Sequence, residues 1–290
     1  MFCSLFGYTK QAYYKCSTGS QHRVIKEQQA KQAVLQIRRQ MPRIGTRKLH
    51  FMLKEQFKTA QIKVGRDKLF TLLGSEGLLI IKRKKYTITT NSKHWMHKYP
   101  NQIKDLLIHR PEQLWVADIT YLETLDANSY LHLITDAYSK QIMGYQLCND
   151  MEATSTLKAL QMAISNRQYP QQPLIHHSDR GLQYCSKLYV NHLLKNKIQI
   201  SMTENGDPYE NAVAERMNGI LKDEFGLGEK MNELTEAIHQ TQQSIQTYNQ
   251  LRPHLSCHYL TPIQMHQQQT IKIKTWKKKT SKVESTLEVL

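Results

Sequence analysis

Apolar residues recur every three or four positions through the first third of the chain, which is the spacing of one face of a helix. Three segments show this pattern, namely 24–40, 46–57 and 66–73. Pro42 ends the first segment, and Thr46 is placed to cap the second. The pattern therefore predicts three short helices, of which the first two form a helix-turn-helix.

Beyond the first third, the pattern changes to short apolar runs separated by turn residues, as in β-strands. These runs cover 114–122, 130–136, 141–148, 173–178 and 198–202, and the first three suit an antiparallel meander. Helical spacing returns at 151–166, 187–195, 209–225 and 231–248. Three strands, then helix, strand, helix, strand and helix, is the order of an RNase H-like core. The prediction is an α/β protein with a mixed five-stranded sheet, preceded by a small helical domain.

The balance of charge narrows the class of partner. The chain of 290 residues carries 40 Lys and Arg against 24 Asp and Glu, for a formal charge of +16 and a pI near 9.5. Nucleic acid is the commonest partner of such a basic chain. The longest apolar run is too short for a membrane span, the start is unlike a signal peptide, and the five cysteines are scattered. These features favour a cytoplasmic, nucleoid-associated protein without disulfides or structural zinc.

Basic residues are the candidates for contacts with DNA. The helical segments carry Arg43, Arg47, Lys48 and Arg66, and a polar segment after them carries Lys82, Arg83, Lys84 and Lys85. A further lysine-rich stretch covers the tail from 272 onward. Such residues suit the phosphate backbone or the major groove. Solvated helix faces in an interaction module remain an alternative from the pattern alone.

Three carboxylates occupy positions that packing alone does not explain. Asp118 interrupts an almost wholly apolar strand, where a buried charge is costly unless cations or donors satisfy it. Asp179 ends another strand, at the edge where open α/β sheets place their sites. Glu215 lies on a predicted helix together with Lys222, which we expect to point toward DNA. Taken singly, each residue suits an ion pair or a solvated surface.

Two strand carboxylates and one helix carboxylate can converge on a pair of hard cations. Carboxylates suit Mg²⁺ and Mn²⁺ better than imidazole or thiolate groups do. Two such ions lower the pKa of an attacking water or hydroxyl and neutralise the leaving oxygen in phosphodiester cleavage. The sequence therefore predicts Asp118, Asp179 and Glu215 as catalytic metal ligands. Asp136, on the neighbouring strand, is a further acidic neighbour without a surrounding catalytic motif.

The motifs around these carboxylates closely resemble those of a known family. They read Trp115-x-x-Asp118-x-Thr120, His177-Ser178-Asp179-x-Gly181-x-Gln183-Tyr184-x-Ser186 and Asn211-Ala212-x-Ala214-Glu215-Arg216-x-Asn218-Gly219-x-Leu221-Lys222. The chain also has Tyr248-Asn249-x-x-Arg252-Pro253-His254 with Thr261-Pro262, and begins with Leu5-Phe6-Gly7-Tyr8. This set resembles the DDE transposases of bacterial insertion sequences, and more narrowly OrfB of the insertion sequence 3 family. The resemblance covers nearly the whole chain except the lysine tail.

The resemblance implies an RNase H-like integrase core that uses two catalytic metals. It implies cleavage at the ends of an element, followed by attack of the freed 3′-hydroxyl on a second phosphodiester. It also implies a homo-oligomer on DNA and a fusion or association with an upstream OrfA product. One departure is Glu210, where the family commonly has Asp. We prefer Glu215 as the third ligand because it has the family's spacing from Asp179.

The predicted organisation has four parts. Residues 1–95 form the basic helix-turn-helix region, 96–110 a linker, 111–268 the catalytic core with a trailing helix, and 269–290 a basic tail. The predicted function is metal-dependent cleavage and strand transfer in DNA transposition. A plain nuclease that hydrolyses without joining, and a non-catalytic DNA-binding repressor, are the alternatives.

Overall fold

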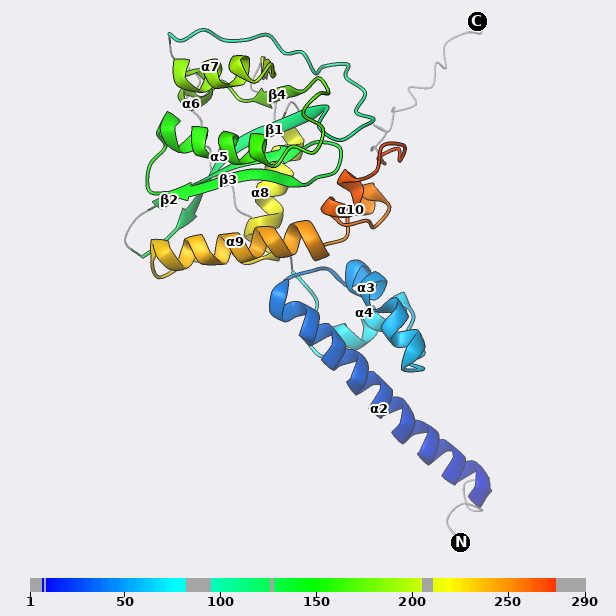
Figure 1. The fold of residues 1–290 in the computed structure, drawn as a ribbon. Coiled ribbons are helices and arrows are strands. Elements are labelled where there is room, and N and C mark those ends of the chain that lie inside the picture. Colours follow the sequence, from blue (N-terminus) through cyan, green and yellow to red (C-terminus); the bar gives the residue numbers. More distant parts are fainter. Residues whose placement is uncertain (1–6, 8, 82–94, 126–127, 205–210, 275–290) are drawn as a thin grey trace, which may run out of the picture.

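The computed structural model describes the chain except for residues 1–6, 8, 82–94, 126–127, 205–210 and 275–290. It has an N-terminal helical part, with one long helix that projects away, and an α/β part built on a single sheet (Figure 1). Within the described residues, the structure contains no helix that is both long and apolar enough to cross a membrane.

Three helices make up the N-terminal part, as predicted: α2 (Lys10–Gln40), α3 (Thr46–Thr59) and α4 (Arg66–Ser75). Their buried apolar side chains pack together; they include Ala30, Val34, Leu49, Leu53, Leu69 and Leu73. The predicted helix-turn-helix corresponds to α2 and α3, which are joined by residues 41–45.

Two details of this part were predicted wrongly. Helix α2 begins at Lys10 rather than near Val24, and Val24 and Ile25 are 59% and 54% exposed. The apolar pattern marks only the half of α2 that packs on other helices, so it missed the projecting half. Thr46 is the first helical residue of α3, while Gly45 is the N-cap and makes no side-chain cap bond.

The sheet has five strands in the order β3-β2-β1-β4-β5. Strands β1 (Leu114–Glu123), β2 (Asn128–Asp136) and β3 (Ile142–Cys148) form an antiparallel meander. Strands β4 (Ile175–Ser178) and β5 (Gln199–Met202) then extend it in parallel from β1. This is the mixed five-stranded sheet that the order of elements predicted, and the RNase H-like fold is confirmed.

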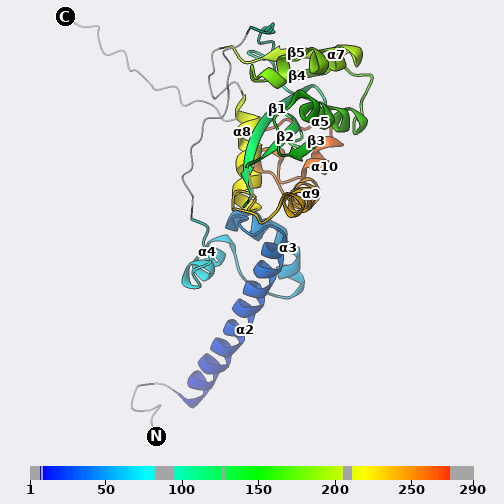
Figure 2. The ribbon, with the colours of Figure 1, turned by 90° about the vertical axis from the view of Figure 1, so that its left-hand side faces the viewer.

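Helices cover both faces of the sheet, because successive side chains of β1 point to opposite sides. On one face, Trp115 and Ala117 pack with α5 (Ala153–Ser165) and α7 (Lys187–Lys195), which is preceded by the short α6 (Leu182–Cys185). On the other, Leu114 and Val116 pack with α8 (Ala212–Glu224). Figure 2 shows α8 and α5 on opposite sides of the strands. Asp118 continues the alternation of Leu114 and Val116, so it belongs to the α8 face.

The chain ends its described part with α9 (Leu234–Leu251), the short 3₁₀ helix η2 (Leu255–Cys257) and α10 (Pro262–His266). Thr261 begins α10 with a capping box that includes Gln264. Segment 96–110, the predicted linker, lies against the core: the amide of Gln102 donates to Ser201 Oγ at 2.9 Å beside β5.

Candidate active site

Asp118 and Asp179 are brought level by the parallel pairing of β1 with β4. The last recorded pair is Val116 with His177. Asp118 lies two residues beyond Val116, and Asp179 directly follows the end of β4, two residues beyond His177. The two carboxylates are close enough for the charge of Asp179 to raise the pKa of Asp118. The positions were predicted from each strand separately, but only the pairing of these two strands brings the carboxylates together.

The loop after β4 holds Asp179 in a defined conformation. Its Oδ1 accepts a hydrogen bond of 3.0 Å from the backbone amide of Gly181. A Cβ at Gly181 would lie 3.0 Å from that same oxygen and 3.1 Å from Oε1 of Gln183. A side chain at 181 would therefore crowd the carboxylate, and glycine allows the close turn.

Helix α8 is hydrogen-bonded to β1 at Ala117 and at Asp118. Nδ2 of Asn211 donates to the carbonyl of Ala117 at 3.0 Å. About two helical turns later, Nδ2 of Asn218 donates to Oδ2 of Asp118 at 2.7 Å. Glu215 lies between these two asparagines, in the first turn of α8, with its side chain exposed. The hydrogen bonds of these two asparagine side chains thus hold Glu215 close to the strand that carries Asp118.

The electrostatics show that the three carboxylates share one environment. The pKa of Asp118 rises to about 7, mainly because burial penalises its charge, and also because Asp179 and Glu215 are nearby anions. Hydrogen bonds from the Ile119 amide and from Asn218 offset part of this rise. Burial also raises the pKa of Glu215. The site is a group of mutually repelling carboxylates, which a cation would stabilise.

The carboxylates are near one another without forming a closed coordination shell. Across the residues that the structure describes, no three His, Cys, Asp or Glu side chains converge tightly enough to form a ready metal site. The amide oxygen of Asn218 is buried and lacks a hydrogen-bond partner among the described residues. An unsatisfied hard oxygen therefore lies next to Asp118, on the residue that already contacts it.

Lys222 is two helical turns beyond Glu215 and contacts an aromatic ring. Its Nζ lies 4.3 Å from the ring centroid of Tyr121 on β1. A cation at this distance from a tyrosine ring is attracted by its π-electrons. Tyr121 and Asn218 are the two neighbours of the site that the sequence did not single out. The signal for Asn218 was its spacing of three residues from Glu215, which places both on one side of a helix.

The predicted DNA-binding residues of the N-terminal part have different surroundings. Arg47 is exposed, and the exposed Arg66 pairs with its neighbour Asp67 at 2.8 Å. Arg43 donates through Nη2 to the carbonyl of Ile81 at 2.6 Å. Lys48 forms an ion pair of 2.9 Å with Glu224 in the core.

Other acidic and basic candidates are separate from the carboxylate group or outside the described residues. Asp136 accepts hydrogen bonds from the amides of Glu112 and Ser139, both at 2.7 Å, and from Ser139 Oγ at 2.8 Å. These bonds give it a part in shaping the loop after β2. Lys82, Arg83, Lys84, Lys85 and Glu210 lie outside the residues that the structure describes.

Comparison with known proteins identifies the family. Residues 108–208 and 196–262 each match a family model described as an integrase core domain. A 31 kDa protein of insertion element IS600 from Shigella sonnei is 33% identical over 264 residues, covering 90% of this chain and 95% of the relative. The transposase for insertion sequence element IS629, also from Shigella sonnei, is 31% identical over 76% of this chain and 75% of the relative. The chain belongs to the DDE transposases of bacterial insertion sequences. The resemblance seen in the sequence motifs is thereby confirmed.

Further relatives agree with this assignment. Transposase InsF for insertion sequence IS3A of Escherichia coli is 33% identical over 158 residues, which is 54% of each protein. Among solved structures, the catalytic core domain of HTLV-2 integrase in complex with magnesium is 21% identical, with a TM-score of 0.44 over 54% of this chain and 97% of that one. As a member of the family shown by the sequence relatives, the transposase is an enzyme of DNA transposition, a polynucleotidyl transferase of the DDE type.

Proposed function

We propose that this transposase cleaves DNA at the ends of an insertion sequence and joins the freed 3′-hydroxyl to a second phosphodiester, with Asp118, Asp179 and Glu215 as its catalytic carboxylates. The observation that carries the proposal is the placement of Asp118 on β1, where it accepts a hydrogen bond of 2.7 Å from Asn218, three residues after Glu215 on α8, and where the paired strand β4 ends directly before Asp179. The nearness of the other two carboxylates also raises the pKa of Asp118, after the larger effect of burial. Three like charges gathered from β1, β4 and α8 are costly for the fold alone, which favours a role in binding cations.

The residues present fit two Mg²⁺ or Mn²⁺ ions. All three proposed ligands are carboxylates, and the amide oxygen of Asn218 is a further hard donor beside them. Bound there, the ions would activate the attacking oxygen and neutralise the leaving one. Asn218 and the Ile119 amide each bond one oxygen of Asp118, so they fix the plane of its carboxylate before a metal binds.

The chemistry consists of two displacements at phosphorus, a hydrolysis followed by a transesterification. In the first, a water oxygen bonds to phosphorus while the bond to the 3′-oxygen of the element end breaks, which leaves a 3′-hydroxyl. In the second, that hydroxyl oxygen bonds to a phosphorus of the target DNA while a target 3′-oxygen leaves. Lys222 binds a phosphate of the DNA end near Glu215, and the ring of Tyr121 supports its ammonium group.

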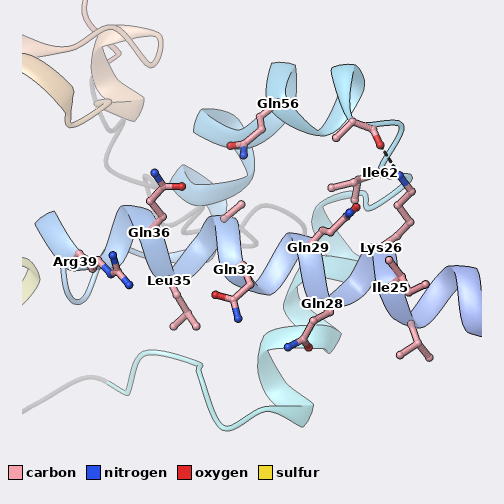
Figure 3. Close-up of a pocket in the computed structure, with 13 residues that line it drawn as sticks. Ile25, Lys26, Gln28, Gln29, Gln32, Leu35, Gln36, Arg39, Gln56 and Ile62 are labelled. Carbon is pink, nitrogen blue, oxygen red and sulfur yellow. Dashed lines mark hydrogen bonds between the residues drawn. The ribbon is translucent and has the colours of Figure 1, made fainter.

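The helical part binds DNA in this proposal, with Arg43, Arg47, Arg66 and the Lys82–Lys85 segment as candidate contacts, whereas Lys48 is already paired with Glu224. A groove of about 930 Å³ between α2 and α3 is lined by five glutamines together with Lys26 and Arg39, and no acidic residue is among those that line it (Figure 3). Amide and cationic side chains suit phosphates and base edges. The groove lies in the helical part and is separate from the carboxylates.

The same proposal assigns the remaining parts of the chain. Residues 1–95 bind DNA, and residues 96–110 link them to the catalytic core. Residues 111–268 catalyse cleavage and joining, and residues 269–290 add contacts with phosphates. The active form is a homo-oligomer on DNA, fused to or associated with an upstream OrfA product.

Variants at Glu215, Asp223 and Glu210 test the proposal. Glu215→Gln keeps the size of the side chain but removes its charge, so we expect loss of cleavage and joining with DNA binding retained. Asp223→Asn, an exposed position on the same helix, is the matched control and should leave both reactions unchanged. Cleavage and joining are measured on one labelled element end with Mg²⁺, alongside a gel-shift assay.

The outcomes separate the competing functions. Cleavage without joining by the wild-type protein indicates a plain nuclease, and binding without either reaction indicates a repressor. Normal joining by Glu215→Gln together with loss of joining in Glu210→Gln assigns the third carboxylate to Glu210 and contradicts the proposal.

A further inference from the structure

Glu224, the last residue of α8, connects three segments that are far apart in the sequence. Arg252, after α9, donates to it twice, from Nε to Oε2 and from Nη2 to Oε1, both at 2.8 Å. Lys48, in the first turn of α3, donates to Oε1 at 2.9 Å. The backbone carbonyl of Glu224 also accepts a hydrogen bond of 3.0 Å from the backbone amide of Arg43. One residue of the catalytic core therefore contacts both the helical part and the segment after α9.

The core side of this network is buried and firmly attached to the sheet. Arg252 is 2% exposed, and its Nη1 donates to Nε2 of His254 at 2.8 Å. The hydroxyl of Tyr248 lies 2.7 Å from that nitrogen and 2.8 Å from the carbonyl of Lys140. Because Arg252 can only donate, Nε2 of His254 is an acceptor and the ring is neutral. Burial and the Arg252 charge likewise keep the pKa of His254 well below its usual value.

Asn249 adds a second attachment to the sheet. Its side chain amide pairs with both backbone groups of Ile142, accepting at 3.0 Å and donating at 3.0 Å, as a neighbouring strand would. The motif from Tyr248 to His254 thus holds the end of α9 against β3 and presents Arg252 to Glu224.

On the other side, α3 is attached to the core at a second point. The rings of Phe51 and Tyr259 stack with centroids 4.5 Å apart and an interplanar angle of 14°. Lys48 and Phe51 are three residues apart, so both lie on one face of α3. Two adjacent contacts, one ionic and one aromatic, therefore resist rotation of the helical part about either one.

We infer that Lys48, Glu224 and Arg252 are positioning residues, which set the helical part at a defined orientation to α8 and so align bound DNA with Glu215. The inference rests on the proposed function. Glu224 lies nine positions after Glu215 on the same helix, a distance of about 14 Å along one rigid element. A change in the orientation of the helical part relative to Glu224 therefore displaces the bound DNA end relative to the carboxylates. In this view Lys48 contacts the core, and not the DNA backbone.

Lys48→Met tests the inference because it removes the charge and keeps a straight apolar stem. Glu224 stays paired with Arg252 through two hydrogen bonds, so the core remains folded. We expect the joining rate at saturating DNA to fall about tenfold or more, with the affinity for the element end changed less than about threefold. Lys48→Arg, which restores the charge, should recover the rate to within about threefold. Lys54→Met, an exposed lysine on the same helix, is the matched control and should match wild type.

A contact of Lys48 with DNA gives the opposite pattern. The affinity would then weaken, the slope of log affinity against log salt would flatten by about 0.9, and the rate at saturating DNA would stay normal. That result overturns the inference, and so does a Lys48→Arg variant that stays as slow as Lys48→Met.

Hydrogen exchange supplies a readout that does not depend on activity. In the full-length Lys48→Met protein without DNA, amides of 46–52 and 256–260 should exchange faster than in Lys54→Met, while those of β1 should not change. Unchanged exchange at both segments contradicts the positioning role even if the enzyme has lost activity. If the Lys48→Met protein exchanges faster but the wild-type protein neither cleaves nor joins DNA, the first result supports the contact between Lys48 and Glu224. The second result then contradicts the proposed function.

Discussion

Asp118→Asn tests the electrostatic character of the carboxylate group most directly. Burial, followed by the charges of Asp179 and Glu215, raises the pKa of Asp118 from 3.8 to about 7. The folded protein therefore holds this proton more tightly than the unfolded chain does. For a carboxyl group with a raised pKa, the contribution to stability is fully present below the unfolded value and is lost as the pH rises through the folded value. The affected window runs from about pH 4 to pH 7.

The size of the effect follows from the shift. Each pKa unit corresponds to about 1.4 kcal/mol, so the raised pKa of Asp118 costs the metal-free fold about 4 kcal/mol at pH 8, where the folded side chain is ionised, and about 2 kcal/mol at pH 5, where folding requires uptake of a proton. These are upper limits, because the side chain is partly exposed to water. Asparagine cannot ionise, and its amide oxygen can still accept the hydrogen bond from Asn218, while its amide nitrogen cannot accept the one from the Ile119 amide, which offsets part of the gain. We therefore expect Asp118→Asn to be more stable than wild type without metal, by more at pH 8 than at pH 5.

The assay is urea unfolding of both proteins at the two pH values, with chelator and then with Mg²⁺. Added Mg²⁺ should stabilise wild type at pH 8 and have little effect on Asp118→Asn, which should also fail to cleave or join DNA. Asp223→Asn serves as the control for removal of a carboxylate from the same part of the protein. A variant that is no more stable than wild type at pH 8, or whose gain is equal at both pH values, refutes the electrostatic argument.

Three further predictions concern other contacts. Tyr121→Leu removes the ring beside the Lys222 ammonium and should weaken filter binding of the element end about two- to fivefold, whereas Tyr121→Phe keeps the ring and should bind normally. Gly144→Ala should lower the free energy of unfolding in urea by about 1–3 kcal/mol or prevent folding, because a Cβ there would lie 2.1 Å from the carbonyl of Ala159 on α5; unchanged stability would show that α5 moves at little cost. Arg47→Ala should flatten the salt dependence of DNA affinity by about 0.9, and an unchanged slope would remove Arg47 from the set of phosphate contacts.

The sequence alone determined the order of helices and strands and the identity of the unusual carboxylates. Apolar periodicity reports which side of each segment is buried, and this depends mainly on local geometry. For this reason the strand at Asp118 and the helix at Glu215 were predicted close to their observed limits. The same signal missed the part of α2 before Val24, and it counted Val24 and Ile25 as a buried face although both are exposed.

Only the tertiary structure decided which of these residues meet. The parallel register of β1 and β4 brings Asp118 level with Asp179, and the amide of Asn218, 100 residues from Asp118 in the sequence, reaches its carboxylate. Likewise, Lys48 could not be told from a DNA-contacting lysine until it was seen beside Glu224, 176 residues away. Periodicity marks a buried face but does not specify its partner, because the pairing of distant segments is set by the packing of the whole chain and not by any one segment of it.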